Sequence, residues 1–200
     1  MSKKFKLGVI GNPIEHSLSP FIHSRFSRNE NINVEYLPYK VTDEDFDLFI
    51  REFFSDKDSK GLNVTLPHKK KAAEIEGVIS REAKYIHAVN TIVSDEKKIF
   101  LYSTDGIGFI NDMENKNFSL KEKNILIIGA GAAAESVIYR LAKSEAQHIT
   151  VLNRTVEKAD RLIRKFSNMT SINTESNSEA PYDLVINGSS AGLTGEFKPI

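Results

Sequence analysis

A strand-to-helix connection built on glycine constrains the fold of this chain more than any other segment. Asn124-Ile-Leu-Ile-Ile128 is a short, branched and apolar run, which is typical of a parallel strand buried on both faces. Gly129-Ala-Gly-Ala-Ala-Ala134 follows at once, matches the pattern G-x-G-x-x-A, and leads into a helix expected to end near Lys143. This context predicts a dinucleotide-binding fold, because the helix start offers free N–H groups to a pyrophosphate. A glycine-rich turn without a ligand is the alternative.

The residues of this turn have distinct expected roles. Gly129 makes the tight turn, Gly131 lets the backbone approach the pyrophosphate, and Ala134 permits close packing of the helix. The residues expected to line the cofactor are Gly129, Ala130, Gly131, Ala132 and Ala133.

The next predicted strand, residues 148–152, indicates which dinucleotide is bound. It ends in Asn153-Arg154-Thr155, where an acidic residue would select the free 2′-hydroxyl of NAD. Arg154 can instead pair with a 2′-phosphate, with Asn153 and Thr155 as neutral donors, so NADP is the expected cofactor. An arginine that is simply solvated at a strand end is the alternative. A further strand at residues 182–187 precedes a loop, 188–192, from which Ser189 is expected to contact the cofactor.

Composition narrows the class of partner. The 200 residues are 40% hydrophobic, and Lys+Arg and Asp+Glu balance at 27 each, so no net field draws the chain to nucleic acid or anionic lipid. There is no cysteine, which excludes disulfides and thiolate metal sites and fits a reducing compartment. The apolar runs are too short for a signal-peptide core or a membrane span. A small-molecule partner, no metal site and a cytoplasmic location are expected.

Strands and helices alternate in the first hundred residues, which predicts an α/β unit. Strands are expected at residues 5–10, 34–41, 62–66, 88–93 and 99–102. Ser19-Pro20 reads as an N-cap followed by proline at the first helical position, and the spacing of Phe46, Phe49, Ile50 and Phe53 predicts an amphipathic helix. A short helix is expected over residues 70–76, and a polar linker over residues 111–123.

A lysine and an aspartate are the candidate catalytic residues. Pro67 lacks an N–H and ends the strand before it, so Lys69 falls on the turn beyond the strand's carboxyl edge, where open α/β sheets hold ligands. Asp105 follows the strand 99–102 in the same way, which makes the two a candidate proton-transfer pair. The alternatives are a surface lysine among Lys69–Lys71 and a turn aspartate before Gly106. His16 and His68 are expected to be packing or surface residues, with His68 as a fallback acid.

Seven motifs occur in an order that resembles the shikimate dehydrogenase family. They are Gly11-Asn-Pro-Ile-Glu-His-Ser-Leu-Ser-Pro20, Asn63-Val-Thr-Leu-Pro-His-Lys69, Ala88-Val-Asn-Thr91, Thr104-Asp-Gly-Ile-Gly108, Gly129-Ala-Gly131, Asn153-Arg-Thr155 and residues 187–192. The resemblance implies NADP-dependent, reversible reduction of 3-dehydroshikimate to shikimate, within chorismate and aromatic amino acid biosynthesis.

The resemblance also implies residue roles. Ser17 and Ser19 would bind the substrate carboxylate, and Thr65, Asn90 and Asp105 would hold ring hydroxyls. Lys69 would contact the substrate and form the catalytic pair with Asp105, since reducing a ketone needs a proton donor within reach of its oxygen. His87 stands where the family usually has glycine, a departure that costs strain if φ is positive there.

The expected architecture is a two-domain α/β protein. An N-terminal α/β substrate-binding and catalytic domain spans residues 1–104, and a Rossmann-like, doubly wound and mostly parallel dinucleotide-binding domain spans residues 105–200. The second domain is expected to be incomplete at the C-terminus, because only about four of the roughly six strands of such a fold precede Ile200. The alternatives are a non-catalytic fragment or degenerate dinucleotide-binding protein, and a quinate/shikimate dehydrogenase using NAD or NADP. A homodimer is left open.

Overall fold

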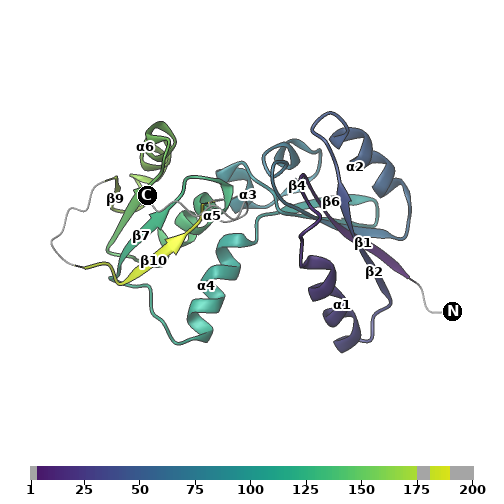
Figure 1. Cartoon of the computed structure of the whole chain (residues 1–200), viewed down its shortest axis with the longest axis horizontal. Helices are drawn as coiled ribbons and strands as arrows, with labels where there is room; N and C mark the ends of the chain where they lie inside the picture. Colours follow the sequence, from purple (N-terminus) through teal and green to yellow (C-terminus); the bar gives the residue numbers. More distant parts are fainter. Residues whose placement is uncertain (1–3, 175–180, 190–200) are drawn as a thin grey trace. The chain divides into compact units, whose positions relative to one another are not determined.

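The chain divides into two compact units, residues 1–103 and residues 104–200. The computed structural model describes residues 4–174 and 181–189. Of the loop expected at residues 188–192, residues 190–192 lie outside the described part. Both units are α/β and each has its own sheet (Figure 1), so the expected fold class is confirmed.

The first unit is built on a six-stranded mixed sheet. Its strands, in sheet order, are β2 (Val34–Lys40), β1 (Phe5–Gly11), β3 (Ser59–Val64), β5 (Thr91–Asp95), β6 (Lys98–Tyr102) and β4 (Val78–Ile79). β1 pairs in parallel with both β2 and β3, whereas β5 is antiparallel to β3 and β6. The five expected strands are present with shifted ends. The short β4 has no counterpart in the sequence prediction.

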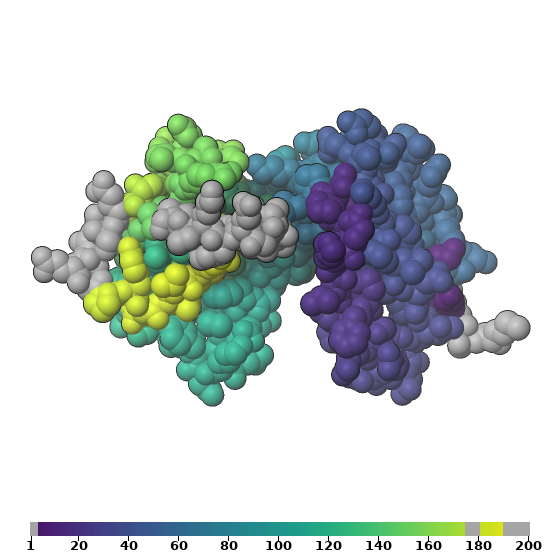
Figure 2. Space-filling model, viewed as in Figure 1, coloured from purple at the N-terminus to yellow at the C-terminus, as the bar shows by residue number. Residues whose placement is uncertain are grey.

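The helices of the first unit are α1 (Ser19–Asn29), α2 (Phe46–Ser55) and α3 (Arg81–Ile86), with one 3₁₀ turn, η1 (Lys71–Glu74). The periodic pattern of α2 is confirmed, because Phe46 and Ile50 are buried against the sheet. Burying a phenylalanine stabilises a fold by roughly 1.5–3 kcal/mol. Helix α1 differs, since each of its residues is at least partly exposed, and Figure 2 shows this segment, in purple, on the surface of its unit.

Two helix predictions in this unit were wrong in detail. Ser19 is the first residue of α1 and not its N-cap, which is Leu18; the Ser17 hydroxyl accepts from the Ser19 N–H at 3.3 Å. The helix expected over residues 70–76 is the single turn η1, because the chain becomes extended again at Ile75. Helix α3 was not predicted; its start is capped by Ser80, whose hydroxyl accepts from the Ala83 N–H.

The second unit has a four-stranded, fully parallel sheet in the order β10 (Leu184–Asn187), β7 (Asn124–Ile128), β8 (His148–Leu152) and β9 (Ile172–Asn173). The predicted bounds of β7 and β8 are confirmed. Its helices are α4 (Asp105–Asn115), α5 (Ala132–Leu141) and α6 (Val156–Phe166). Each helix in the described ranges is too short or too polar to cross a membrane.

The polar linker expected over residues 111–123 was a wrong prediction. Residues 111–115 form the last turn of α4, and α4 packs along α5 as part of the second unit (Figure 1). Gly106 and Gly108 lower the intrinsic helix propensity of this segment, so its helix depends on tertiary packing.

Candidate active site

Four strand ends of the first sheet meet at one edge. The Thr65 N–H donates to the Ile10 carbonyl at 2.9 Å, the Val64 N–H to the Asn90 carbonyl at 2.8 Å, and the Asn90 N–H to the Tyr102 carbonyl at 3.0 Å. The ends of β1, β3 and β6 and the start of β5 are therefore joined in one row. Two predicted substrate residues, Thr65 and Asn90, lie within this row.

Lys69 lies on a turn that begins at this edge. Strand β3 ends at Val64, two residues before the predicted end, and Thr65 opens the turn by accepting the His68 N–H at 3.0 Å. The Lys69 carbonyl accepts from the Val89 N–H at 2.8 Å, next to Asn90. The expected position of Lys69, beyond the carboxyl end of a strand, is confirmed.

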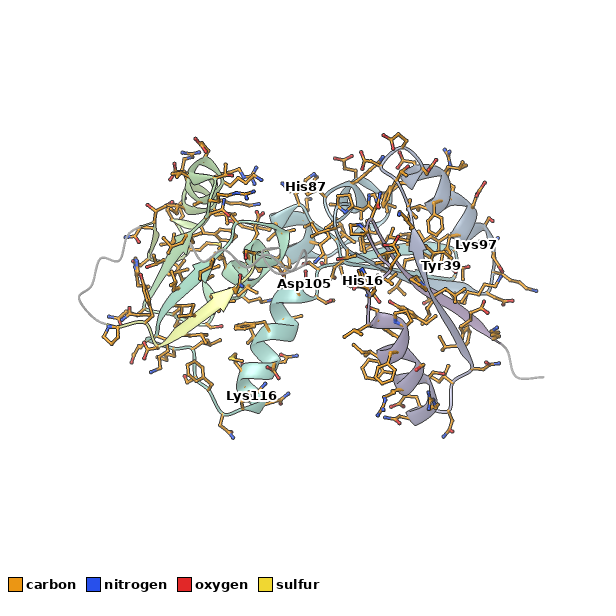
Figure 3. The ribbon with its side chains drawn as sticks, viewed as in Figure 1. His16, Tyr39, His87, Lys97, Asp105 and Lys116 are labelled. Atoms are coloured by element: carbon orange, nitrogen blue, oxygen red, sulfur yellow. The ribbon has the colours of Figure 1, made fainter. Side chains whose placement is uncertain are left out.

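The neighbouring His68 points into the core. Its side chain is fully buried, its ring packs on Phe46 at 5.2 Å between centroids, and Nε2 lies 2.7 Å from the Val41 carbonyl oxygen. Because a carbonyl only accepts, Nε2 carries the hydrogen of this bond. His68 is therefore the packing residue that the sequence favoured, and its burial removes the alternative of a second acid at the site. His16 is exposed on the loop before α1 (Figure 3).

The loop that carries Ser17 and Ser19 is fixed beside the Lys69 turn. The Asn12 N–H donates to the Leu66 carbonyl at 2.9 Å. A Cβ at Gly11 would lie 2.6 Å from Thr65 Cγ2, so a side chain there would displace Thr65. The edge thus brings together five predicted substrate residues of this unit, namely Ser17, Ser19, Thr65, Lys69 and Asn90.

A hydrogen-bonded network at this edge was missed by the sequence reasoning. The Tyr36 hydroxyl donates to Asn63 Oδ1 at 2.7 Å, and Asn63 and Thr91 connect onward to Asn90. Asn63 and Thr91 lie inside the quoted motifs, and the signal was a polar side chain directly beside apolar residues that the strands bury, Leu62, Val64 and Ile92.

Asp105 is the first residue of α4, three residues after β6, and belongs to the second unit. A carboxylate at a helix start is favoured by the helix dipole. The Gly106 N–H donates to the buried Ser136 hydroxyl of α5 at 2.9 Å. A Cβ at Gly106 would lie 2.3 Å from the Ser136 carbonyl oxygen, so glycine is required for the approach of α4 to α5. Figure 3 shows Asp105 and Lys116 at opposite ends of this helix region.

The glycine turn has the geometry of an anion site. Gly129 has φ +115°, and a Cβ there would lie 2.8 Å from the Ser189 backbone nitrogen, so only glycine fits. Gly131 is the N-cap of α5, and a Cβ there meets nothing within 4 Å. Among the described residues, the space beside Gly131 at the start of α5 is therefore open, and Gly131 has no side chain to cap the helix. A phosphate group fits this arrangement.

The segment after β8 lies at the same sheet edge as the glycine turn, because β7 and β8 are parallel neighbours in register. The Asn153 side-chain amide donates to the Thr155 carbonyl at 2.7 Å, and Thr155 is the N-cap of α6. Arg154 is exposed on this turn. The structure thus brings the predicted cofactor residues, 129–133, 153–155 and 189, to the carboxyl ends of β7, β8 and β10.

The chain matches known proteins along most of its length. Residues 9–92 match the model of the shikimate dehydrogenase substrate binding domain, and residues 112–193 match that of shikimate / quinate 5-dehydrogenase. The shikimate dehydrogenase (NADP(+)) of Nitrosopumilus maritimus is 36% identical over 100% of the chain and 74% of that protein. A crystal structure of shikimate dehydrogenase from Aquifex aeolicus has a TM-score of 0.88 and 34% identity, covering 100% of the chain and 74% of its own. A crystal structure of shikimate dehydrogenase in complex with NADP+ has a TM-score of 0.83 and 33% identity, covering 94% of the chain and 68% of its own. This chain belongs to the shikimate dehydrogenase family.

Proposed function

We propose that this protein is an NADP-dependent shikimate dehydrogenase, which reversibly reduces 3-dehydroshikimate to shikimate in the shikimate pathway. The observation that supports this most is the set of hydroxyl, amide and ammonium groups gathered beside Lys69 at the edge of the first sheet. Such a set suits a small ligand with a carboxylate and several hydroxyls. We assign the substrate domain to residues 1–104 and the NADP domain to residues 105–200.

The substrate contacts follow from side-chain chemistry. Ser17, on the loop before α1, and Ser19, the first residue of α1, donate hydroxyl hydrogens to the carboxylate. Thr65, Asn90 and Asp105 hold ring hydroxyls; an amide both donates and accepts, whereas a carboxylate accepts. Two serine donors are expected to orient the ring by its carboxylate end, which leaves the reacting carbon to be placed by the hydroxyl contacts.

Lys69 and Asp105 carry the proton chemistry in this proposal. When NADPH is bound, it supplies a hydride to the carbonyl carbon. The Lys69 ammonium supplies the proton to the carbonyl oxygen, or stabilises the alkoxide as its charge develops. Asp105 orients the lysine and an adjacent hydroxyl. In the reverse direction Lys69 takes the hydroxyl proton back.

The cofactor residues have a division of roles. The first turn of α5, beyond Gly131, receives the pyrophosphate, because the backbone N–H groups of a helix start and the positive end of the helix dipole both favour an anion. Arg154 pairs with the 2′-phosphate of NADP, and Asn153 and Thr155 position that arginine through their own turn. Ser189 lies against Gly129, so it is expected to contact the cofactor beyond the pyrophosphate.

The test of the activity is reduction of NADP by shikimate with the purified 200-residue chain, followed at the nicotinamide absorbance, with NAD and quinate run in parallel. Shikimate- and NADP-dependent turnover is expected. Lys69→Ala is expected to lower kcat by at least about 100-fold, the size of a general-acid contribution. Lys70→Ala, the exposed neighbour, is the matched control and is expected to retain activity. Full turnover by Lys69→Ala would overturn the assigned role.

The cofactor assignment has its own test. Arg154→Ala is expected to raise the KM for NADP by about tenfold or more and to leave the KM for NAD nearly unchanged, because only NADP carries the 2′-phosphate. Lys158→Ala, an exposed cation one turn into α6, is the control. Equal changes for both cofactors would contradict the pairing with the 2′-phosphate.

A further inference from the structure

A chain of hydrogen bonds runs from β2 to the start of β5 across the first sheet, and Tyr36, near Ser19 of α1, lies at one end of it. The Tyr36 hydroxyl donates to Asn63 Oδ1 on β3 at 2.7 Å. The Ser19 side chain lies near the same hydroxyl and lowers the pKa of Tyr36, which opposes the larger effect of burial.

The Tyr36 ring is held in place by α1. His23 lies one turn after Ser19 on that helix, and its ring stacks on Tyr36 with 4.1 Å between centroids and 9° between planes. Burial lowers the pKa of His23, which favours the neutral ring at neutral pH. Burial also raises the pKa of Tyr36 to about 12, so its hydroxyl keeps its hydrogen throughout the neutral range.

The chain continues from Tyr36 to Asn90. Because Asn63 accepts from Tyr36 through Oδ1, its Nδ2 group faces the opposite way, 3.4 Å from Thr91 Oγ1 and 3.5 Å from the Asn90 carbonyl. The Thr91 hydroxyl in turn donates to Asn90 Oδ1 at 3.0 Å. The orientation of the Asn90 amide is therefore set through Asn63 and Thr91 by a hydroxyl that lies three strands away in the sheet.

We propose that Tyr36 is a positioning residue for the substrate: it supports the Ser19 side chain on one side and, through Asn63 and Thr91, orients the Asn90 amide on the other. This inference rests on the proposed function, which gives Ser19 and Asn90 to the substrate. Tyr36 acts on groups that bind the carboxylate and a ring hydroxyl, and not on the groups that move the proton. Its loss therefore weakens substrate binding more than it slows the chemical step.

The experiment is a calorimetric titration of shikimate, and separately of NADP, into the parent chain and Tyr36→Phe. The variant keeps the stacked ring and removes the hydroxyl, and is expected to bind shikimate about tenfold more weakly with NADP binding unchanged. Tyr39→Phe, on the same strand with its ring against Phe49 and Phe53, is the matched control and is expected to bind shikimate like the parent. In turnover, Tyr36→Phe is expected to raise the KM for shikimate and to keep kcat within about twofold.

A double-mutant cycle separates positioning from a general structural role. If Tyr36 acts largely through Asn90, adding Tyr36→Phe to Asn90→Ala has a much smaller effect on shikimate binding than it has in the parent chain. Thermal unfolding checks that each variant folds. Should Tyr36→Phe not fold, His23→Leu, which removes the ring stacked on Tyr36 together with its edge contact to Phe26, is expected to weaken shikimate binding by two- to fivefold.

The shikimate-binding measurements distinguish a failure of this inference from a failure of the proposed function. Equal shikimate binding by the parent and by folded Tyr36→Phe overturns the role of Tyr36 and leaves the proposed function standing. A full, additive effect in the Asn90→Ala background overturns the route through Asn90. A folded parent that binds NADP and does not bind shikimate overturns the proposed function together with this inference.

Discussion

The turn that follows β3 and the turn that follows β7 both lie at the carboxyl end of a parallel strand, yet they are held in opposite ways. The turn after β7 is fixed by the absence of side chains, since Gly129 has a positive φ and lies against the backbone at Gly188 and Ser189. The turn after β3 is fixed by a side chain and by distant backbone. His68 is buried under it, and the Lys69 carbonyl accepts from the Val89 N–H.

This difference determines which substitutions each turn tolerates. The glycine turn cannot keep its conformation when atoms are added, because there is no room for a Cβ at Gly129. The turn after β3, which carries Lys69, is destabilised when atoms are removed, because His68 fills the core beneath it and donates to the Val41 carbonyl. A turn defined by missing side chains is visible in a short sequence window, whereas a turn defined by a buried contact depends on residues far along the chain.

Of the substitutions that test this difference, Gly129→Ala is expected to have the largest effect on the free energy of unfolding. The added methyl would force a side chain into φ +115° and within 2.8 Å of the Gly188 carbonyl carbon and the Ser189 nitrogen. Backbone strain and overpacking together are expected to lower the free energy of unfolding by about 3 kcal/mol or more. Urea unfolding followed by circular dichroism measures this, and NADP binding is expected to be lost.

Gly131→Ala is the matched control. Its φ is −89° and a Cβ there meets no atom of the described residues within 4 Å, so the free energy of unfolding is expected to change by less than about 1 kcal/mol. The same Cβ occupies the open space proposed for the pyrophosphate, so NADP binding is expected to weaken. A stability loss as large as that of Gly129→Ala would show that the two glycines are not separated into a folding and a binding role.

The same contrast explains how much of the fold the sequence could predict. The bounds of β7 and β8 were predicted because each is a short strand of mainly apolar residues, followed at once by a glycine turn or a polar turn. Helix α3 was missed because it has only six residues and is stabilised by burying Ala83 and Ile86. The start of α4 was missed because Gly106 opposes a helix locally, and its fit against Ser136 is a tertiary contact.

The candidate site likewise contains features that could be predicted from the sequence and features that could not. The position of Lys69 could be predicted because Pro67 ends a strand by its own chemistry. The anchoring by His68 and the alignment by Tyr36 could not, because each depends on a partner about 27 residues away that sequence alone does not place. The roles of the cofactor residues in binding remain predictions for the titrations described above.

His68→Leu is the next largest test and addresses the turn after β3. Leucine keeps much of the apolar volume beside Phe46 but leaves the Val41 carbonyl without its donor, which is expected to cost about 1–3 kcal/mol in free energy of unfolding. Turnover is expected to fall as well, because the next residue, Lys69, loses its fixed position. Urea unfolding and the shikimate assay measure the two effects.

His68→Gln is the control for this loss. The glutamine amide can place an N–H close to the position of the imidazole Nε2, so part of the stability and activity is expected to return. His16→Gln, at an exposed position, is expected to change neither. If leucine and glutamine at position 68 were equally stable, the bond to Val41 would not be what holds the turn.

His87→Gly is the smallest expected effect, and it is expected to stabilise the chain. His87 ends α3 with φ 53° and ψ 50°, and the Ala88 N–H reaches back to the Ala83 carbonyl at 3.2 Å, so the residue occupies the left-handed position that helix ends usually give to glycine. Histidine is tolerated there at a modest cost, and relief of that cost is partly offset by the greater freedom of an unfolded glycine. A gain of about 0.5–1 kcal/mol in free energy of unfolding is expected.

The exposed contact between His87 and Glu74, at 3.7 Å, contributes little, and Glu74→Gln measures that contribution separately. Because the segment from Ala88 to Asn90 holds the Lys69 carbonyl, a lower stability of His87→Gly would mean that the histidine side chain supports the lysine turn and is not merely tolerated beside it.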